Sequence, residues 1–199
     1  AENGDPGSQF ELGQHYFTGN SVPKDYDKAA KWYRRAAQQG HAGAQANLGG
    51  LYDEGRGVPR NDEKAVKYYR EAAQQGNPLG QYNLGVAYAK GYGGVPKNME
   101  KAASLARQAA EQGYARAQHS LAISYWDGMG VTQDREKAAK WERKAAKQGI
   151  VEAQKNLGVM YLQGDGVPED QQKAIHWFRK AADQGNSQAR KKLEELGVQ

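Results

Sequence analysis

The sequence predicts an all-α fold, a right-handed α/α superhelical solenoid of helix-loop-helix repeats, and three observations support this prediction. A marker pentapeptide, "AAQQG" or a close variant, ends at Gly40 and returns four more times at intervals of 36 or 37 residues. A glycine loop such as "GRGVPRN" returns in step with the marker. Between these two signals, apolar residues fall at the three- and four-residue spacing of a buried helix face. The chain is therefore predicted to be a stack of repeated helix pairs.

The marker glycines divide the chain into five full repeats and two partial ones. Residues 1–4, "AENG", match the tail of a preceding repeat, so we expect the natural protein to extend upstream of this point. Residues 186–199 match the first helix of a sixth repeat, whose polar surface suits a C-terminal capping helix. The full repeats are residues 5–40, 41–76, 77–113, 114–149 and 150–185.

The second repeat shows how the residues specify each element. Apolar and small residues such as Leu48 recur every four positions and form the buried face of a first helix. Gly55 stops that helix, Pro59 excludes further helix in the loop, and Asn61 or Asp62 caps the second helix. The arginines of this loop are replaced in the other copies, so the loop is predicted to be a connector and not a phosphate site. The second helix buries a stripe formed by Ala65, Tyr68, Tyr69, Ala72 and Ala73.

The composition excludes several classes of protein. The chain has 12 Tyr, 4 Trp and 3 Phe, more aromatic residues than a disordered chain carries. Its 38% hydrophobic content and mean hydropathy of −0.96 favour an elongated fold over a compact globule. No apolar window is long enough for a membrane-spanning helix and no signal peptide is visible, so we expect no membrane insertion. Because cysteine is absent, disulfides, thiolate zinc sites and cysteine nucleophiles are excluded.

The repeat resembles the Sel1-like repeat family. Each copy approximates A-Q-x-N-L-G-x-x-Y, then G-x-G-V-P, then K-A-x-x-W/Y-Y/F-R-x-A-A-x-Q-G, and the resemblance covers essentially the whole chain. Tetratricopeptide repeats share the L-G-x-x-Y core but have a period of about 34 residues and a proline near the repeat end. The resemblance implies a tetratricopeptide-like solenoid that acts as a protein-binding scaffold or adaptor. It also implies a bacterial protein that is periplasmic, secreted or part of the cell envelope, in a family linked to virulence, host interaction and toxin immunity.

Side chains that recur at one repeat position are predicted to be architectural. Three of the four tryptophans, Trp32, Trp141 and Trp177, share one position and are predicted to pack in the core. A lysine series and an arginine series recur on the second helices, where acidic residues alternate with basic ones at the spacing that stabilises a helix. The net charge of +5 keeps nucleic-acid binding open as an alternative. The mixed charges favour a solvated outer face, and we expect no nucleic-acid partner.

The sequence shows no pattern of catalytic or metal-binding residues. The four histidines lie in different repeats at different positions, and no zinc or calcium motif occurs. One S-x-x-K motif, "SVPK" from Ser21 to Lys24, straddles the loop proline instead of opening a helix. We therefore expect no catalytic residue, no cofactor and no metal. A small-molecule binder or enzyme of the β-lactam-binding type, suggested by some cysteine-rich relatives, is the least favoured alternative.

Function is expected at positions that vary between repeats and face the concave wall. By similarity to tetratricopeptide arrays, the first helices line that wall at repeat positions 3, 6, 10, 13 and 14. Large aromatic residues there are typical of protein-binding hot spots, and Trp126 is the one tryptophan outside the core series. The alternative is that these side chains fill the space where neighbouring first helices touch. The predicted partner-binding residues are Phe10, Phe17, Asp53, Tyr82, Arg116, His119, Trp126 and Lys155.

The sequence therefore predicts a non-enzymatic scaffold that holds a protein or peptide in its concave groove. A second hypothesis is a structural spacer within a longer repeat array, which the tail-like residues 1–4 favour.

Overall fold

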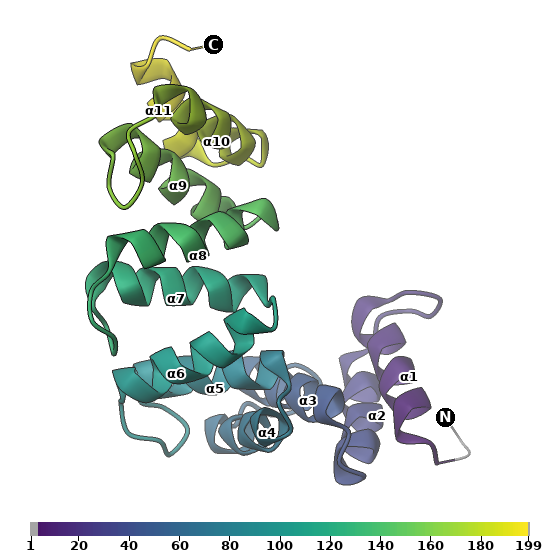
Figure 1. The fold of residues 1–199 in the computed structure, drawn as a ribbon. Helices are drawn as coiled ribbons and strands as arrows, with labels where there is room; N and C mark the ends of the chain where they lie inside the picture. The colour runs from purple at the N-terminus through teal and green to yellow at the C-terminus, as the bar shows by residue number, and fades with distance from the viewer. Residues whose placement is uncertain (1–3, 199) are drawn as a thin grey trace. The chain divides into compact units, whose positions relative to one another are not determined.

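The structure, a computed structural model, describes residues 4–198 and is helical throughout (Figure 1). No strand occurs in that range. The predicted tail of a preceding repeat lies outside the described residues except for Gly4. The helices are α1 (Pro6–Thr18), α2 (Tyr26–Gln38), α3 (Ala42–Glu54), α4 (Asp62–Gln74), α5 (Pro78–Lys90), α6 (Met99–Glu111), α7 (Ala115–Asp127), α8 (Arg135–Lys147), α9 (Val151–Gln163), α10 (Gln171–Asp183) and α11 (Ser187–Glu195).

The chain forms two compact units, residues Ala1–Ala109 and Ala110–Gln199. The first unit contains α1 to α5 and most of α6, and the second contains the last turn of α6 and α7 to α11. Within each unit, consecutive helices pack against one another, as from α1 to α5 and from α7 to α11. Each unit is therefore a stack of helix pairs, and the all-α, repeated fold class predicted from the sequence is confirmed.

The helix ends lie where the repeat pattern predicts them. Helix α3 ends at Gly55, which has the left-handed conformation with φ of 67° and donates its N–H to the carbonyl oxygen of Leu51. Helix α4 begins after Asn61, whose Oδ1 accepts a hydrogen bond from the backbone N–H of Lys64 at 2.8 Å. A residue without a side chain is favoured at Gly55 because a Cβ strains a positive φ. Glycine and asparagine thus set the two ends of the loop.

A buried glutamine in the first helix ties each helix pair together. Gln118 is 4% exposed, and its Nε2 donates to the carbonyl oxygen of Ala110 at 3.1 Å. Its Oε1 accepts a hydrogen bond from Nε2 of Gln148, in the marker pentapeptide of the same repeat, at 2.8 Å. Because these buried amides satisfy one another, they have an architectural role. The equivalent pairs are Gln9 with Gln39, Gln45 with Gln75, and Gln154 with Gln184.

The recurring lysines and arginines also have structural partners. The Nζ atom of Lys137 lies 5.6 Å from the centroid of the Tyr125 ring and 2.9 Å from the carboxylate of Asp134, the cap of its own helix. The Nη2 atom of Arg143 donates to the hydroxyl of Tyr161, on the next helix, at 2.9 Å. Cation–π contacts and capping pairs of this kind explain why the basic residues recur at fixed positions.

The prediction that three tryptophans share the core is wrong for two of them. Trp177 is 8% exposed, but Trp32 and Trp141 are half-buried. The guanidinium of Arg35 lies 4.7 Å from the centroid of the Trp32 ring, and Nζ of Lys144 lies 4.1 Å from that of Trp141. These two indoles lie at the edge of the helix pair under a basic side chain. The fully buried aromatic residues lie at the next repeat position and are Tyr33, Tyr69 and Phe178, whereas the fourth repeat has Glu142 there.

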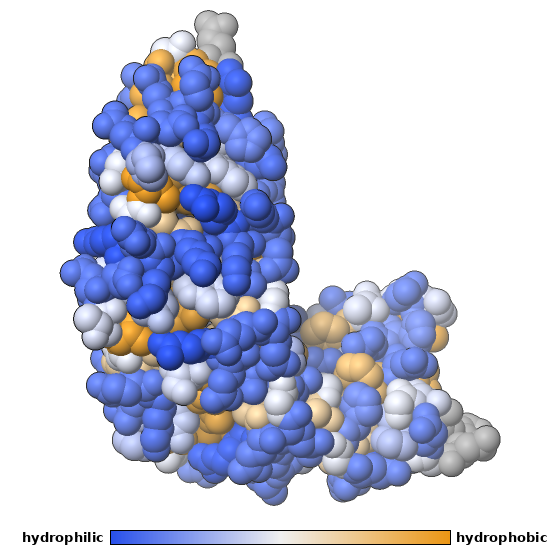
Figure 2. Space-filling view, in the orientation of Figure 1, coloured by the Kyte–Doolittle hydropathy of each residue, from blue (hydrophilic) through white to orange (hydrophobic). Residues whose placement is uncertain are grey.

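The visible surface is mostly hydrophilic, with small and separate hydrophobic patches (Figure 2). Across the part of the chain that the structure describes, none of the helices has the length and apolar character needed to cross a bilayer.

Candidate functional site

In three repeats, an aromatic ring of the second helix packs directly on a glycine of the first helix. A Cβ atom placed on Gly49 would lie 2.7 Å from Cδ1 of Tyr69, closer than real side chains approach. Only glycine fits beneath such a ring, and the ring in turn fills the space beside the first helix. We call this arrangement the aromatic lock. Its three pairs are Gly13 with Tyr33, Gly49 with Tyr69, and Gly158 with Phe178.

The fourth repeat replaces both members of the aromatic lock. Ala122 occupies the glycine position, and Glu142 occupies the position of the aromatic ring. Glu142 remains buried, with its side chain 1% exposed. A carboxylate and a methyl group fill less space than an aromatic ring. A cavity of about 450 Å³ lies beside Ala122 and Glu142.

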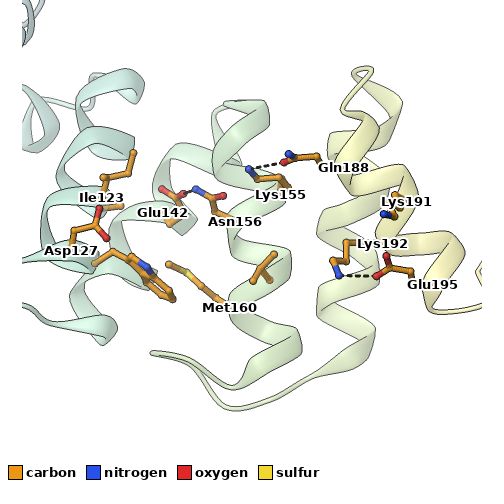
Figure 3. A pocket seen from close by; sticks show the side chains of 13 residues that line it. Ile123, Asp127, Glu142, Lys155, Asn156, Met160, Gln188, Lys191, Lys192 and Glu195 are labelled. Carbon is orange, nitrogen blue, oxygen red and sulfur yellow. Dashed lines mark hydrogen bonds and ion pairs between the residues drawn. The ribbon is translucent and has the colours of Figure 1, made fainter.

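This cavity, which we call the groove, lies within residues 110–199 (Figure 3). Helices α7, α9 and α11, each the first helix of its repeat, supply all of its lining except Glu142, which comes from α8. Many of the lining residues occupy the repeat positions that the sequence predicts for the concave wall. The lining consists of Ala122, Ile123, Trp126, Asp127, Glu142, Lys155, Asn156, Val159, Met160, Gln188, Lys191, Lys192 and Glu195.

The buried carboxylate of Glu142 is held from two sides. Its Oε2 lies 2.9 Å from Nδ1 of His119, on α7, and its Oε1 accepts a hydrogen bond from Nδ2 of Asn156, on α9, at 2.7 Å. Figure 3 shows the Glu142 and Asn156 side chains pointing toward each other. A neutral imidazole with its proton on Nδ1 is a sufficient donor, so the arrangement does not require a cation. Each carboxylate oxygen accepts one hydrogen bond, and a carboxylate offers about four lone-pair sites.

A buried carboxylate costs more than the aromatic residue it replaces. Moving an ionised carboxylate from water into a protein interior costs about several kcal/mol of free energy. Hydrogen bonds to neutral donors offset only part of this cost. Apolar residues of similar volume are often at least as stable at such positions. Glu142 is therefore the residue of the groove that packing and stability explain least.

The groove has apolar walls and an aromatic side chain at one end. Ile123, Val159 and Met160 contribute apolar surface, and Met160 is itself buried. Trp126 is half-buried, and the guanidinium of Arg135 lies 3.6 Å from the centroid of its ring. This distance is typical of stacking between a guanidinium group and an aromatic face. The stacked guanidinium of Arg135 therefore holds the Trp126 indole in place.

Charged side chains at the two ends of the groove differ in sign. Figure 3 shows Asp127 and Glu142 on the side of α7 and α8, and Lys191 and Lys192 on the side of α11. Nζ of Lys192 forms a 2.7 Å ion pair with Glu195. The groove is therefore polarised, with its acidic end against α7.

The structure places the four predicted site residues of residues 110–199 around this groove or near it. Trp126 and Lys155 line it. Nζ of Lys155 lies 2.7 Å from the carboxylate of Glu152, on the same helix. His119 contacts Glu142 without lining the groove, and Arg116 is exposed on α7 outside it.

Two of the predicted residues in the first unit, Phe10 and Phe17, pack against other aromatic rings. The Phe10 ring stacks on His41 with the ring centroids 4.5 Å apart, and Phe17 packs on Tyr26 with a centroid distance of 5.5 Å. Tyr82, on α5, is half-buried. None of these three rings lines the groove.

Asp53, the remaining predicted residue, belongs to a cluster of phenols. Its Oδ2 accepts a hydrogen bond from the hydroxyl of Tyr69 at 3.4 Å. Burial, with a further contribution from the Asp53 carboxylate, raises the pKa of Tyr92 to about 12. The carboxylate thus satisfies the hydroxyl of an aromatic-lock residue.

Most lining residues, including Asp127 and Asn156, are not among the predicted partner-binding residues, and the sequence contains a clear signal for one of them, Glu142. The fourth repeat reads Trp141-Glu142 where the second reads Tyr68-Tyr69. The third repeat also lacks the aromatic residue, but the fourth alone replaces the lock glycine as well, with Ala122. A search for paired departures from the repeat would have found it.

The other motifs of the sequence form no second site. Within residues 4–198, no group of three or more His, Asp or Glu side chains is arranged to hold a metal ion. Ser21 lies in the loop between α1 and α2 with φ of 68°, so Ser21 and Lys24 do not share a helix face. The arrangement typical of serine acyl enzymes is therefore not formed by "SVPK".

The fold and the groove together define a class, the α/α solenoids built from helix-loop-helix repeats. The family model described as "Sel1 repeat" matches residues 6–41, 42–77, 78–114, 115–150 and 151–186, and the chain belongs to the Sel1 repeat family. Proteins built from Sel1 repeats are generally non-enzymatic scaffolds for protein interaction.

Solved structures similar to this chain include bacterial proteins of the same family. A protective antigen of uropathogenic Escherichia coli is 40% identical, with a TM-score of 0.86, and the match covers 99% of this chain and 43% of that one. A Sel1 repeat protein from Oxalobacter formigenes is 36% identical, with a TM-score of 0.88 and coverage of 98% and 57%. An immunity protein from Pseudomonas aeruginosa, 22% identical with a TM-score of 0.61 and coverage of 92% and 67%, shares the fold. The chain thus spans about half the length of the first two proteins. A search of the curated proteins found no match.

Proposed function

We propose that this chain is a protein-interaction scaffold whose groove, within residues 110–199, binds a peptide segment of a protein partner. The observation that carries the proposal is the groove itself, about 450 Å³ in volume and lined by three successive first helices around Trp126. Binding sites combine apolar walls with a few polar groups, and Trp is enriched among residues that dominate binding energy.

The replacement of the aromatic lock supports a binding role over a purely structural one. A spacer repeat is stabilised by filling the space between its helices, as Tyr69 does in the second repeat. The fourth repeat has no ring at this place, and its buried Glu142 carboxyl group lies at the lining of the groove. A site for a partner explains both departures at once, whereas a spacer explains neither.

We further propose that the protein acts in the bacterial envelope or is secreted. This proposal is supported by the name of the 40% identical relative, a protective antigen of uropathogenic Escherichia coli. Two immunity proteins of Pseudomonas aeruginosa share the fold at 22% and 25% identity, and toxin immunity is therefore a narrower version of the same proposal. Fractionation of cells that express the complete natural protein tests the location, and confinement to the cytoplasm contradicts it.

A random-peptide phage-display library tests the groove as a binding site. Peptides that the wild-type protein selects are synthesised, and their Kd values are measured by fluorescence anisotropy for wild type, Trp126→Ala and Lys155→Ala. We expect Trp126→Ala to weaken binding by about 30-fold, the size of a hot-spot loss of about 2 kcal/mol. Lys155→Ala should have a smaller effect because its ammonium is already paired with Glu152.

The matched control is Trp32→Ala, which removes a half-buried tryptophan from the other unit. It should bind the selected peptides as wild type does. Selection of peptides whose affinity is the same for wild type and Trp126→Ala, with both proteins folded by circular dichroism, contradicts the groove as the binding site. A library that yields no binder contradicts peptide recognition.

A further inference from the structure

We infer that the acidic end of the groove takes a basic side chain of the partner, a lysine or an arginine. This inference rests on the proposed function and names the chemistry of the ligand. It follows from three features of the residues that line the groove: an acidic pair, apolar walls suited to a methylene stem, and carboxylate or amide partners for two of the three lysines, Lys155 and Lys192.

The acidic pair consists of Glu142, which is buried, and Asp127, which is exposed. Asp127 is exposed and makes no hydrogen bond or ion pair within residues 4–198, so its carboxylate is available to a ligand. Glu142 accepts one hydrogen bond on each oxygen from donors that need carry no charge. A buried carboxylate attracts a cation more strongly than an exposed one does, because its surroundings screen the charge less.

The wall of the groove suits the stem of a basic side chain. Lysine and arginine carry three or four methylene groups, which pack on apolar surface while the charged head stays near polar groups. Ile123 on α7 and Val159 and Met160 on α9 provide this surface. Trp126 adds an aromatic face that already binds one guanidinium group, that of Arg135.

The lysines of the groove do not reverse this preference. Nζ of Lys155 lies 2.7 Å from Glu152 and 3.3 Å from Oε1 of Gln188, and Nζ of Lys192 lies 2.7 Å from Glu195. Pairing of this kind reduces the attraction of both lysines for an anionic ligand. Lys191 stands on the far side of the groove, on α11 (Figure 3). A basic residue of the ligand is therefore expected at the acidic end, away from Lys191.

Small probes of side-chain chemistry test the inference without a known partner. We use n-pentylammonium as a mimic of lysine, n-butylguanidinium as a mimic of arginine, and 1-pentanol as the neutral match, all at constant ionic strength. Binding is followed by ¹H–¹⁵N NMR at the indole N–H of Trp126, which Trp126→Phe assigns. We expect both cations to bind about fivefold more tightly than 1-pentanol, the preference that a partly buried ion pair gives.

Charge variants then locate the preference. Glu142→Gln keeps the size of the side chain and an oxygen acceptor, and should remove the preference for cations while 1-pentanol binds unchanged. Asp127→Asn should reduce the preference in part, and Lys191→Gln, the control on the opposite side, should leave it intact. Thermal melting shows whether each variant is folded, and Asp127→Asn tests the inference at an exposed position if Glu142→Gln does not fold.

The outcomes separate this inference from the proposed function. Equal binding of cations and 1-pentanol, a preference that survives both Glu142→Gln and Asp127→Asn, or no shift of the Trp126 indole with any probe overturns the inference. The display experiment still stands in each of these cases, because a peptide that needs Trp126 defines the groove whatever its charge. Peptides that need Trp126 and are enriched in Lys or Arg support both.

Discussion

The second and fourth repeats have the same helices and opposite interiors. In the second, the Tyr69 ring closes on Gly49 and is 1% exposed, and its hydroxyl donates to Asp53. In the fourth, Ala122 and Glu142 take these two places, and the groove lies beside them. The backbone pattern is the same in both, from the left-handed C-cap glycine to the Asn or Asp that caps the second helix.

This difference indicates how a repeat protein gains a site without changing its fold. The glutamine pairs and the N-caps of the second helices are preserved in both repeats, so this part of the backbone does not depend on what fills the space between the helices. One pair of positions, an aromatic residue and the glycine under it, controls whether that space is filled. Substitutions at this pair and its neighbours should therefore change the stability of the protein by different amounts.

Removing the ring from an intact aromatic lock should have the largest effect. Tyr69→Ala is expected to lower the free energy of unfolding by about 3–5 kcal/mol, because a fully buried ring leaves a cavity that the helices only partly close. Urea denaturation measures this loss. Tyr68→Ala, at the half-buried neighbouring position, is the control and should cost clearly less. Equal losses for the two variants contradict the aromatic lock as the principal packing element.

Adding a methyl group beneath the same ring should destabilise the protein less than removing the ring does. The same change at the neighbouring glycine should have the opposite sign. Gly49→Ala is expected to destabilise the protein by about 1–3 kcal/mol, because its Cβ would lie 2.7 Å from the Tyr69 ring. Gly50→Ala, one residue later in the same helix, meets no atom closer than 4.0 Å and should stabilise by up to about 1 kcal/mol. Urea titrations of both variants give the two values. A stabilising Gly49→Ala is incompatible with the lock.

A double-mutant cycle in the fourth repeat tests whether its two departures are coupled. Glu142→Tyr alone should clash with Ala122, and Ala122→Gly alone should weaken the helix. Together they should restore the arrangement of the second repeat and be more stable than the sum of the single changes by about 1–2 kcal/mol. The cycle is measured by chemical denaturation. Additive effects would show that the two positions do not form one unit.

Acid should have the smallest effect, through the helix caps. Hydrogen bonds from the backbone N–H and from the side chain of Lys137 hold the pKa of the Asp134 carboxyl below its usual value. The pKa of Asp25 is lowered in the same way by Lys28. A carboxyl whose pKa is lower in the folded state stabilises the protein above its unfolded pKa of about 3.9, and this contribution is lost as the pH falls through the folded value.

Asparagine substitution isolates this effect. Asn61 and Asn98 already cap helices in this chain, so Asp25→Asn with Asp134→Asn keeps the caps without a titrating group. The melting temperature of this variant should fall less than that of wild type when the pH is lowered from about 5 to about 2. Parallel curves for the two proteins would exclude a contribution from the caps.

The repeat architecture was predictable because it depends on local signals. Gly55 and Asn61 mark helix ends by backbone conformation and capping, which a sequence states directly. The burial of the aromatic pair was less predictable. Successive helix residues point about 100° apart, so a pattern with two adjacent aromatics does not reveal which one faces inward. This is why Trp32 and Trp141 were placed in the core although they lie at its edge.

Two of the predicted partner-binding residues line the groove, and their role in binding a partner stays a prediction. Trp126 and Lys155 were found because they lie at first-helix positions that vary between repeats. Glu142 lies on a second helix, where the recurring residues were predicted to have structural roles. Its burial and its contacts with His119 and Asn156 depend on three helices that meet in space, which no single repeat contains.

The central hypothesis is that replacement of the aromatic lock in the fourth repeat creates the binding site. The measurement that tests it most directly is the Kd of a display-selected peptide for wild type and for the double variant Ala122→Gly with Glu142→Tyr. The double variant should fold at least as stably as either single variant and bind the peptide at least about tenfold more weakly, because the ring fills the groove. An unchanged Kd in the folded double variant would contradict the claim.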